Sequence, residues 1–330
     1  MKKRTKRMGF FVVLVVVAIA MFACDGGGDN GNGGNGGDNG NGSNTIEDKW
    51  MDVADSTFSH DTINSIVWGN DKFVATANGG IIVYSTDGIT WSFALSYAIF
   101  LDVGHIAWGN NMFVAAGRDK SGISVMAYSF DGIIWTLTET NIYSPRIVWA
   151  NDKFVAVGTR GKMAYSTDGI TWTAVDDILD DILVDYNKYD EWYLNINSIA
   201  WGNNKFIMSC RYSSLVDYDY YDVDLILYSE NGIKWQEIEG SNIYDIIPNV
   251  SGITWGNDKF VAVGNEYKIS ENELLVFYRK SAYSTDGIKW TAIENTTFVD
   301  TQITCIAWGN NKFVAGGTRG KMAYWNGNVK

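Results

Sequence analysis

Two side chains that could bind an anion occupy equivalent positions in a tryptophan-containing sequence motif that occurs six times in the chain. His105 and Arg146 lie three residues before a tryptophan of this motif, and the corresponding residues elsewhere are Ser65, Ser198, Gly252 and Cys305. An imidazole beside a guanidinium offers several N–H donors to one anion. The alternative is that both are hydrogen-bonded structural residues, as most polar groups of protein interiors are.

Tyrosines and arginines between the recurring phrases are further candidates for binding. Tyrosine can stack on a sugar ring or anchor a protein partner, and neighbouring carboxylates can accept sugar hydroxyls or hold Ca²⁺. The alternative is that these are solvated acidic loops that keep the protein soluble. The candidates are Tyr186, Tyr189, Tyr218, Tyr220 and Tyr221, together with Arg118, Arg160 and Arg319.

Metal and cofactor chemistry is disfavoured by the residue inventory. The chain has two histidines, His60 and His105, and its three cysteines, Cys24, Cys210 and Cys305, are far apart in the repeat. Two histidines and cysteines that lie far apart disfavour a zinc centre, and no glycine-rich phosphate loop is present. We predict neither a resident cofactor nor a catalytic residue, with Ca²⁺ as the one ion the acidic loops could hold.

The N-terminus predicts export and anchoring. Five basic residues among the first seven precede an apolar run from Gly9 to Ala23 that ends at Cys24. The run would form about 22 Å of helix, whereas a bilayer core is roughly 30 Å thick. Residues 1–23 therefore form an export signal. Met21-Phe22-Ala23-Cys24 resembles a lipoprotein processing box, which implies lipidation of Cys24; ordinary cleavage or an uncleaved anchor are alternatives.

Residues 24–44 predict a flexible tether, because after Cys24 they contain only Gly, Asn, Asp and one Ser. Without residues 1–23 the chain keeps 21 basic against 38 acidic residues, a net charge of −17. This charge repels nucleic acid and anionic lipid. We expect a monomer in the bacterial cell envelope, lipid-anchored and facing away from the cytoplasm.

The recurring phrase defines residues 45–330 as an array of six repeats. Each copy has a tryptophan with isoleucine two residues before it and phenylalanine five residues after it, and the tryptophans are Trp68, Trp108, Trp149, Trp201, Trp255 and Trp308. A second phrase, typified by Ser85-Thr86-Asp87-Gly88-Ile89-Thr90-Trp91, follows in five of the units. Each unit reads as four short strands, which predicts an all-β, six-bladed β-propeller rather than a solenoid.

The two ends of the chain predict how the ring closes. The sixth unit stops after its third strand, at Tyr324-Trp325, whereas the segment around Trp50 matches the fourth strand around Trp290. Trp50 precedes Trp68 by 18 residues, as Trp290 precedes Trp308. We expect the N-terminal strand to complete the last blade, where it pairs an edge that would otherwise be exposed.

The second phrase resembles the Asp-box, or BNR repeat, of sialidase-like propellers. Every copy here lacks one residue between Asp and Gly relative to that box. The resemblance implies a structural turn between the third and fourth strands of a blade, carried by Asp87, Asp131, Asp168, Asn231 and Asp286. It also raises the possibility of a sialidase-like hydrolase, although no Arg-Ile-Pro segment opens the first blade.

Length variation predicts which face of the propeller binds. Insertions at 117–123, 211–224, 264–280 and 175–196 all enlarge the face that carries the connections between strands two and three and between blades. Loops that vary on a rigid scaffold often carry function. We therefore predict a non-catalytic protein that binds a glycan or a protein ligand on this face. A carbohydrate-active hydrolase and an envelope assembly scaffold are the alternatives.

Overall fold

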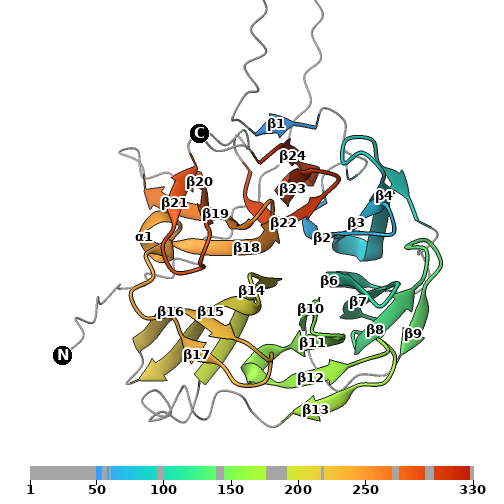
Figure 1. The fold of residues 1–330 in the computed structure, drawn as a ribbon, viewed down its shortest axis with the longest axis horizontal. Helices are drawn as coiled ribbons and strands as arrows, with labels where there is room; N and C mark the ends of the chain where they lie inside the picture. The colour runs from blue at the N-terminus through green and yellow to red at the C-terminus, as the bar shows by residue number, and fades with distance from the viewer. Residues whose placement is uncertain are drawn as a thin grey trace, which may run out of the picture. The chain divides into compact units, whose positions relative to one another are not determined.

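The computed structural model describes residues 50–53, 58, 61–94, 100–138, 145–175, 192–216, 219–269, 275–293 and 301–327. All of them belong to one compact unit, residues 48–330. Its strands form six antiparallel sheets of four strands each, arranged around a central axis (Figure 1). The expectation of a six-bladed β-propeller is confirmed. The signal at 1–23, the tether at 24–44 and Cys24 lie outside the described residues.

Each blade has an inner, a second, a third and an outer strand. The inner strands are β2 (Ile63–Gly69), β6 (Asp102–Gly109), β10 (Arg146–Ala150), β14 (Trp192–Gly202), β18 (Asn249–Gly256) and β22 (Ile303–Gly309). The second strands are β3 (Lys72–Ala77), β7 (Met112–Arg118), β11 (Lys153–Val157), β15 (Lys205–Val216), β19 (Lys259–Ile269) and β23 (Lys312–Gly317).

The third strands are β4 (Ile81–Ser85), β8 (Ser124–Ser129), β12 (Met163–Ser166), β16 (Asp219–Ser229), β20 (Leu275–Ser284) and β24 (Met322–Trp325). The outer strands are β5 (Ser92–Phe93), β9 (Thr136–Thr138), β13 (Thr173–Val175), β17 (Gln236–Glu237), β21 (Thr291–Ile293) and β1 (Met51–Asp52). Single helical turns are η1 (Asn78–Gly80), η2 (Thr159–Gly161), η3 (Thr318–Gly320) and α1 (Ile243–Ile246).

The ring closes through the N-terminal strand, as expected from the sequence. Strand β1 pairs antiparallel with β24, Met51 opposite Tyr324, in a sheet ordered β1-β24-β23-β22. Trp50 is only 2% exposed, and its ring centroid lies 6.0 Å from that of Trp325. The sixth blade is therefore built from segments near both ends of the described chain, and β1 covers the edge of β24 that would otherwise be unpaired.

Tight hairpins explain why the phrase between first and second strands keeps its length. Both residues of each two-residue turn have positive φ, as in Asn70 (48°) and Asp71 (55°), and the turn residues of all six blades are Asn or Asp. This is the type I′ turn, whose twist matches that of antiparallel strands and whose left-handed backbone Asn and Asp tolerate best.

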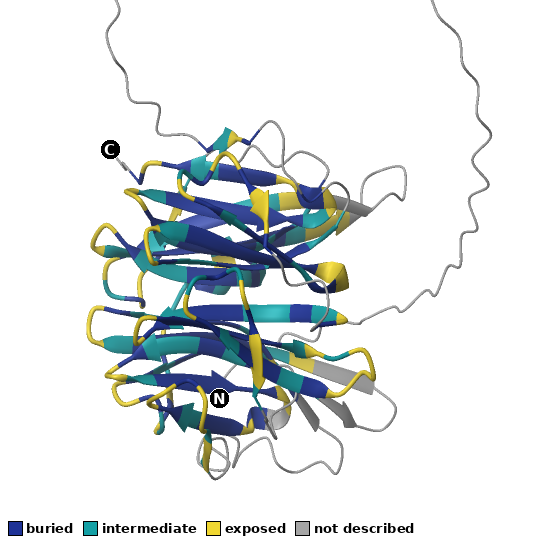
Figure 2. Cartoon of the chain, turned by 90° about the vertical axis from the view of Figure 1, so that its right-hand side faces the viewer, coloured by how far each residue is buried: buried dark blue, intermediate teal, exposed yellow. Residues whose placement is uncertain are grey.

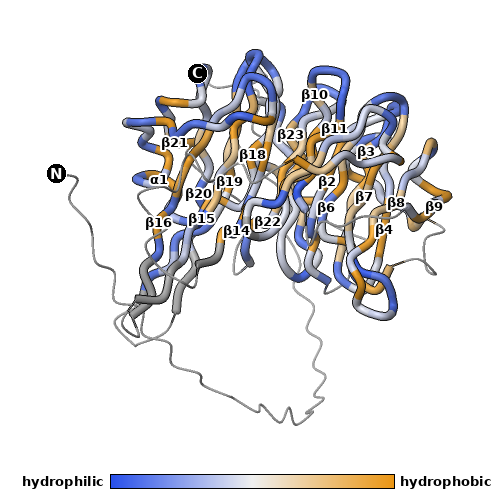
Figure 3. The backbone as a smooth tube through the Cα atoms, turned by 90° about the horizontal axis from the view of Figure 1, so that it is seen from below, coloured by the Kyte–Doolittle hydropathy of each residue, from blue (hydrophilic) through white to orange (hydrophobic). Residues whose placement is uncertain are grey.

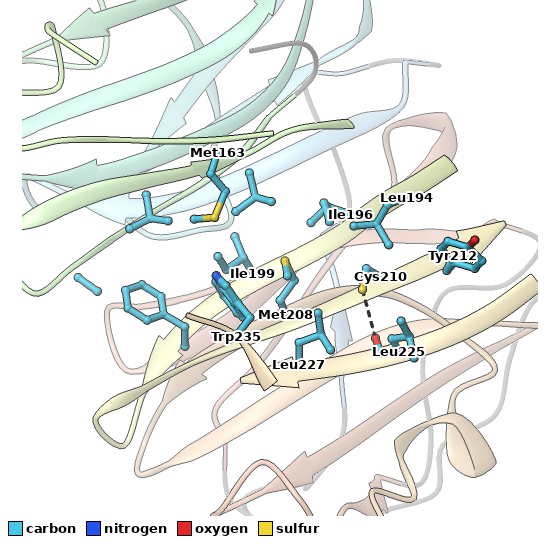
Figure 4. Packing of buried hydrophobic residues seen from close by; sticks show 14 residues of the cluster. Met163, Leu194, Ile196, Ile199, Met208, Cys210, Tyr212, Leu225, Leu227 and Trp235 are labelled. Atoms are coloured by element: carbon cyan, nitrogen blue, oxygen red, sulfur yellow. Dashed lines mark hydrogen bonds between the residues drawn. The ribbon is translucent and has the colours of Figure 1, made fainter. Parts of the chain in front are cut away.

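Side chains of the repeat fill the space between neighbouring blades. The second strands are buried on both faces, so they read as continuous apolar runs such as Phe73-Val74-Ala75. Figure 2 shows buried residues along the strands and exposed residues in the turns. In the cluster between blades three and four, Met163 faces Ile199, Met208 and Trp235 (Figure 4).

Hydrogen bonds link each blade to the next on the face that carries the turns between first and second strands and between third and fourth strands. Asn70 Nδ2 donates to Phe130 O at 3.4 Å and Lys72 Nζ donates to Asp131 O at 3.1 Å. Equivalent bonds start at Asn110, Asn151, Asn203, Asn257 and Asn310. The last of these reaches Thr86 of the first blade, so the clasps run around the whole ring.

Two insertions that the sequence suggested were loops are extended hairpins instead. Residues 211–224 prolong β15 and β16, which pair as far as Val216 and Asp219, and residues 264–280 prolong β19 and β20. Prolonging an existing ladder satisfies each added backbone group, which a loop would leave to solvent. Tyr220 and Tyr221 therefore lie on β16, not in a loop. Figure 3 shows apolar strands ending in hydrophilic turns.

Candidate binding pocket at the mouth of the central channel

The five serine-to-tryptophan turns are structural. In the third blade Asp168 Oδ1 accepts from the backbone N–H of Ile170 (2.9 Å) and of Thr171 (2.7 Å), and Ser166 Oγ accepts from Gly169 N (2.8 Å). These amide donors lower the pKa of Asp168 to about 2. Asn231 makes the same bonds in the fourth blade, and Asp87, Asp131 and Asp286 repeat them.

The six residues three before each tryptophan meet at the waist of the central channel, where all of them line a cavity of about 220 Å³. Three of them hold the next blade through a side-chain acceptor. Ser65 Oγ accepts from Ile106 N (3.3 Å), His105 Nδ1 from Ile147 N (3.1 Å) and Ser198 Oγ from Ile253 N (2.8 Å). The structural interpretation of His105 is thus supported by its hydrogen bond.

The imidazole of His105 is neutral. Burial and, secondly, the positive charge of Arg146 lower the pKa of His105 to about 3. Because Nδ1 accepts a hydrogen bond, the single ring proton belongs on Nε2. His105 therefore contributes no charge to the channel.

Arg146 differs from the other waist residues because guanidinium has donors and no acceptor. Its Nε donates to Asn197 O at 3.1 Å. Burial lowers the pKa of Arg146 below its ordinary value, but an arginine stays charged. No carboxylate pairs with it among the described residues.

A larger pocket of about 550 Å³, here called the entrance pocket, opens on the predicted face. Arg146 lines both the channel and this pocket. Five inner strands carry a β-bulge just before the waist, a device that re-aims side chains. The bulged residues, all of which line the waist or the entrance pocket, are Asn64, Gly104, Asn197, Ser251 and Thr304.

The extended hairpins add one wall of the entrance pocket. Arg211 Nε donates to Asp224 Oδ1 (2.7 Å), and its Nη2 donates to Asp224 Oδ2 (3.1 Å) and Asn249 Oδ1 (2.8 Å). Although burial alone would lower it, the Asp224 carboxylate raises the pKa of Arg211. Tyr267, 42% exposed, lies on the same wall.

Apart from Arg146, the residues of this pocket were not predicted from the sequence, although two variable positions of the repeat indicate most of them. Positions four and six before each tryptophan differ between blades and are mostly polar. Four of the six residues at position six line the entrance pocket: Asp102, Asn195, Asn249 and Gln302. Only the position three before the tryptophan was recognised as variable. Arg211 and Tyr267 could not be placed, because they were assigned to loops.

Of the predicted face residues, the structure brings His105 and Arg146 together at the waist. Arg118, 52% exposed, pairs with Asp102 at 3.3 Å, and Arg319 is an exposed residue of η3. The described lining of the entrance pocket includes neither of them. The side chains of Arg160, Tyr220 and Tyr221, and the whole of Tyr186, Tyr189 and Tyr218, lie outside the described residues. Their roles stay predictions.

Within the described ranges, no three His, Cys, Asp or Glu side chains are grouped to hold a metal ion. In the same ranges no helix has the length and hydropathy needed to span a bilayer.

Comparison with known proteins supports the fold but does not assign the chain to a family. No protein-family model matches the chain, and no curated protein matches it. The structure is similar to a solved structure described as YCF48 bound to D1 peptide, with a TM-score of 0.53 and 11% identity over 86% of this chain and 97% of that chain. The WD40 β-propeller domain of Doa1 gives a TM-score of 0.49 at 8% identity over 84% and 97%. The likeness to the Asp-box family stays a prediction.

Proposed function

We propose that this protein is a non-catalytic binding protein that takes a segment of a protein partner into the entrance pocket. The observation that carries the proposal is a set of polar groups that the fold leaves unused. The side chains of Asn195, Asn197 and Gln302 line the pocket and make no hydrogen bond to another described residue. Other amide side chains, including Asn64 and Asn265 of the same pocket, make hydrogen bonds to the neighbouring blade.

An extended peptide needs both donors and acceptors, and the pocket offers both. Arg146 and the free amides supply donors, and Asp102 Oδ1 is a buried acceptor with no partner. A buried polar group without a partner is costly, and a ligand N–H could satisfy it. The similar propeller YCF48 is described with a peptide bound, which is consistent with such a use of the fold.

A glycan is the second candidate ligand, because amide side chains beside a partly exposed tyrosine also suit a sugar ring. Hydrolysis of a glycan is a weaker candidate. It needs two carboxylates across the cleft, and the described lining holds one acidic residue, Asp102. An assembly scaffold would use the same pocket to hold its partner.

We also propose that Cys24 is lipidated and that residues 24–44 hold the propeller off a membrane, outside the cytoplasm. The basic start, the apolar run and the glycine-rich segment support this. Incorporation of labelled palmitate by expressing cells, compared between the natural chain and Cys24→Ser, tests it. Equal labelling of the two chains contradicts the proposal.

Site-specific crosslinking tests the binding function on intact cells. A photoreactive phenylalanine replaces Tyr267 in one chain and Tyr278 in another. The two tyrosines are similarly exposed, 42% and 46%, but the β19–β20 register puts them on opposite faces of one hairpin. We expect a protein adduct from position 267 only. Equal adducts from both positions, or a glycan-array hit without any adduct from position 267, contradicts a protein partner.

A further inference from the structure

Arg146 stands at a position of the repeat where three of the other five residues have side chains that act as hydrogen-bond acceptors. Ser65, His105 and Ser198 each hold the next blade by accepting a backbone N–H. Guanidinium cannot do this, because it has five donors and no acceptor. Arg146 is therefore not explained by the contact that explains Ser65, His105 and Ser198.

The guanidinium is also only partly used by the protein. Nε donates to Asn197 O, and the two terminal amino groups have no partner among the described residues. They are not sealed inside the protein, because Arg146 is partly exposed and lines both the channel and the entrance pocket.

The charged side chains near Arg146 are paired with one another, so the positive charge of Arg146 is left without a counterion among the described residues. Arg211 is paired with Asp224, and Arg118 is paired with Asp102. His105 is neutral, and Cys305 across the waist stays a thiol because burial raises its pKa to about 12. The described lining thus holds one uncompensated positive charge at the end of a polar pocket, in a chain that is otherwise strongly acidic.

We propose that Arg146 is the binding site for a carboxylate group of the ligand, which enters the waist of the channel through the entrance pocket. This proposal rests on the proposed binding function and specifies which chemical group of the ligand is recognised. A carboxylate matches the planar fork of guanidinium and can accept two parallel hydrogen bonds from it. The Nε2–H of His105 is a further donor that lines the same waist.

Charge and size favour a carboxylate over a phosphate. A single uncompensated cation balances a carboxylate, whereas a phosphate dianion would leave negative charge beside Asp102 and Asp224. The cavity at the waist, about 220 Å³, admits a side chain or a chain end rather than a folded domain. An aspartate or glutamate side chain and a C-terminal carboxylate are the two sources of the group.

Three short peptides distinguish these sources on the purified full-length chain in detergent. Acetyl-Gly-Gly-Gly has a free terminal carboxylate, acetyl-Gly-Glu-Gly-amide has a side-chain carboxylate, and acetyl-Gly-Gln-Gly-amide has neither. Binding is followed by tryptophan fluorescence, because six tryptophans line the waist cavity. We expect at least one carboxylate peptide to bind about tenfold or more tightly than the Gln peptide, because a charge-assisted pair of hydrogen bonds is stronger than a neutral one.

Variants assign the effect to Arg146. Arg146→Gln should remove the preference for the carboxylate peptide, and Arg146→Lys, which keeps the charge but loses the fork, should reduce it. Lys234→Gln removes one positive charge at an exposed turn and should leave the preference unchanged. A melting curve for each variant shows whether it is folded.

The proposal is overturned if the Gln peptide binds as well as the carboxylate peptides, if no peptide binds at millimolar concentration, or if inorganic phosphate binds more tightly than either acid. Its failure is distinct from failure of the binding function. If crosslinking at position 267 is equal with and without Arg146→Gln, the protein partner is supported and the carboxylate site is contradicted. If the carboxylate peptides bind but no protein is crosslinked, the carboxylate site is supported and the protein partner is contradicted.

Discussion

The repeated framework uses the hydrogen-bonding capacity of its Asn and Asp side chains within the fold, whereas the entrance pocket uses that of Asn64, Asn249 and Asn265 and leaves three of its amide side chains without such bonds to described residues. In the framework, Asn70 clasps the next blade and Asp87 accepts backbone amides of its own turn, so the hydrogen-bonding capacity of these residues is used within the fold. At the entrance, Asn195, Asn197 and Gln302 make no such bonds to described residues. Residues that look alike in the sequence therefore differ in whether they are available to a ligand.

The difference follows from position on the blade. On the framework face, the turn of one blade meets the turn of the next at a fixed distance, so each side chain has one geometry in which it is satisfied. At the entrance, bulges lie at the start of five of the six inner strands, where the side chains line an open pocket. Changes in the framework should lower stability and leave binding intact, whereas changes at the entrance should do the opposite.

The largest expected effect is at ring closure. Trp50→Ala removes a buried ring that packs against Trp325 from the far end of the chain, so we expect a loss of about 3–5 kcal/mol in the free energy of unfolding. Urea unfolding measures it. Tyr267→Ala at the entrance is the control and should lose less than about 1 kcal/mol. A loss of similar size in both variants would remove the distinction between the two regions.

A smaller effect is expected where one blade rests on the next. A Cβ added at Gly109 would lie 2.0 Å from Trp149 Cγ, so Gly109→Ala should destabilise the chain by about 2–3 kcal/mol. Ala150 occupies the equivalent position in the third blade. Ala150→Gly should cost only about 1 kcal/mol, through backbone entropy. Equal unfolding midpoints for Gly109→Ala and the natural chain would show that the blades can shift apart.

His105 links the two regions, and its effect depends on pH. Its folded pKa of about 3 lies below the unfolded value near 6.5, so the unfolded chain binds the extra proton between these values. Stability contributed at neutral pH is therefore lost as pH falls below 6.5, by about 1.4 kcal/mol per unit. Between pH 6.5 and 5 the natural chain should lose about 1.6 kcal/mol more than His105→Gln, because the unfolded histidine is already half protonated at pH 6.5. Parallel stability profiles would show that His105 titrates normally.

The smallest effect separates the charge of a framework turn from its hydrogen bonds. Asp168→Ala should cost about 1 kcal/mol because the backbone N–H groups of Ile170 and Thr171 lose their acceptor. Asp168→Asn should cost much less, because Asn231 already does this work in the fourth blade. The folded pKa of Asp168 is depressed, so any advantage of Asp over Asn should vanish as pH falls from about 4 to 2. Thermal unfolding at several pH values measures both variants.

Much of the fold could be predicted because the repeat restates the same physical constraints six times. The tryptophan and the phenylalanine five residues later face each other across a two-residue turn, with ring centroids 4.4 to 4.6 Å apart in every blade. Alternation of strands and turns fixed the blade, and the match between Trp50 and Trp290 predicted the closure. Local turn chemistry is legible in sequence because it depends on a few adjacent residues.

The site was predictable only in part. His105 and Arg146 were recognised because they stand out at a position that is otherwise small, and the ring of blades brings them together. Tyr267 and Arg211 were not recognised, because their segments resemble loops in length and polarity. Whether an insertion becomes a loop or a longer hairpin depends on pairing between its two halves, as between Leu215 and Tyr220, which length does not reveal.

The number of blades, the order of strands and the strand that closes the ring can be read from the amino-acid sequence, since each follows from repeated local patterns. Which polar residues are available to a ligand becomes clear only in the folded ring. Ser65 and Arg146 are equivalent in the repeat, yet Ser65 accepts a backbone N–H of the next blade and Arg146 keeps two amino groups for the channel. That distinction depends on groups contributed by other blades, because a hydrogen bond across the ring joins residues the sequence keeps far apart.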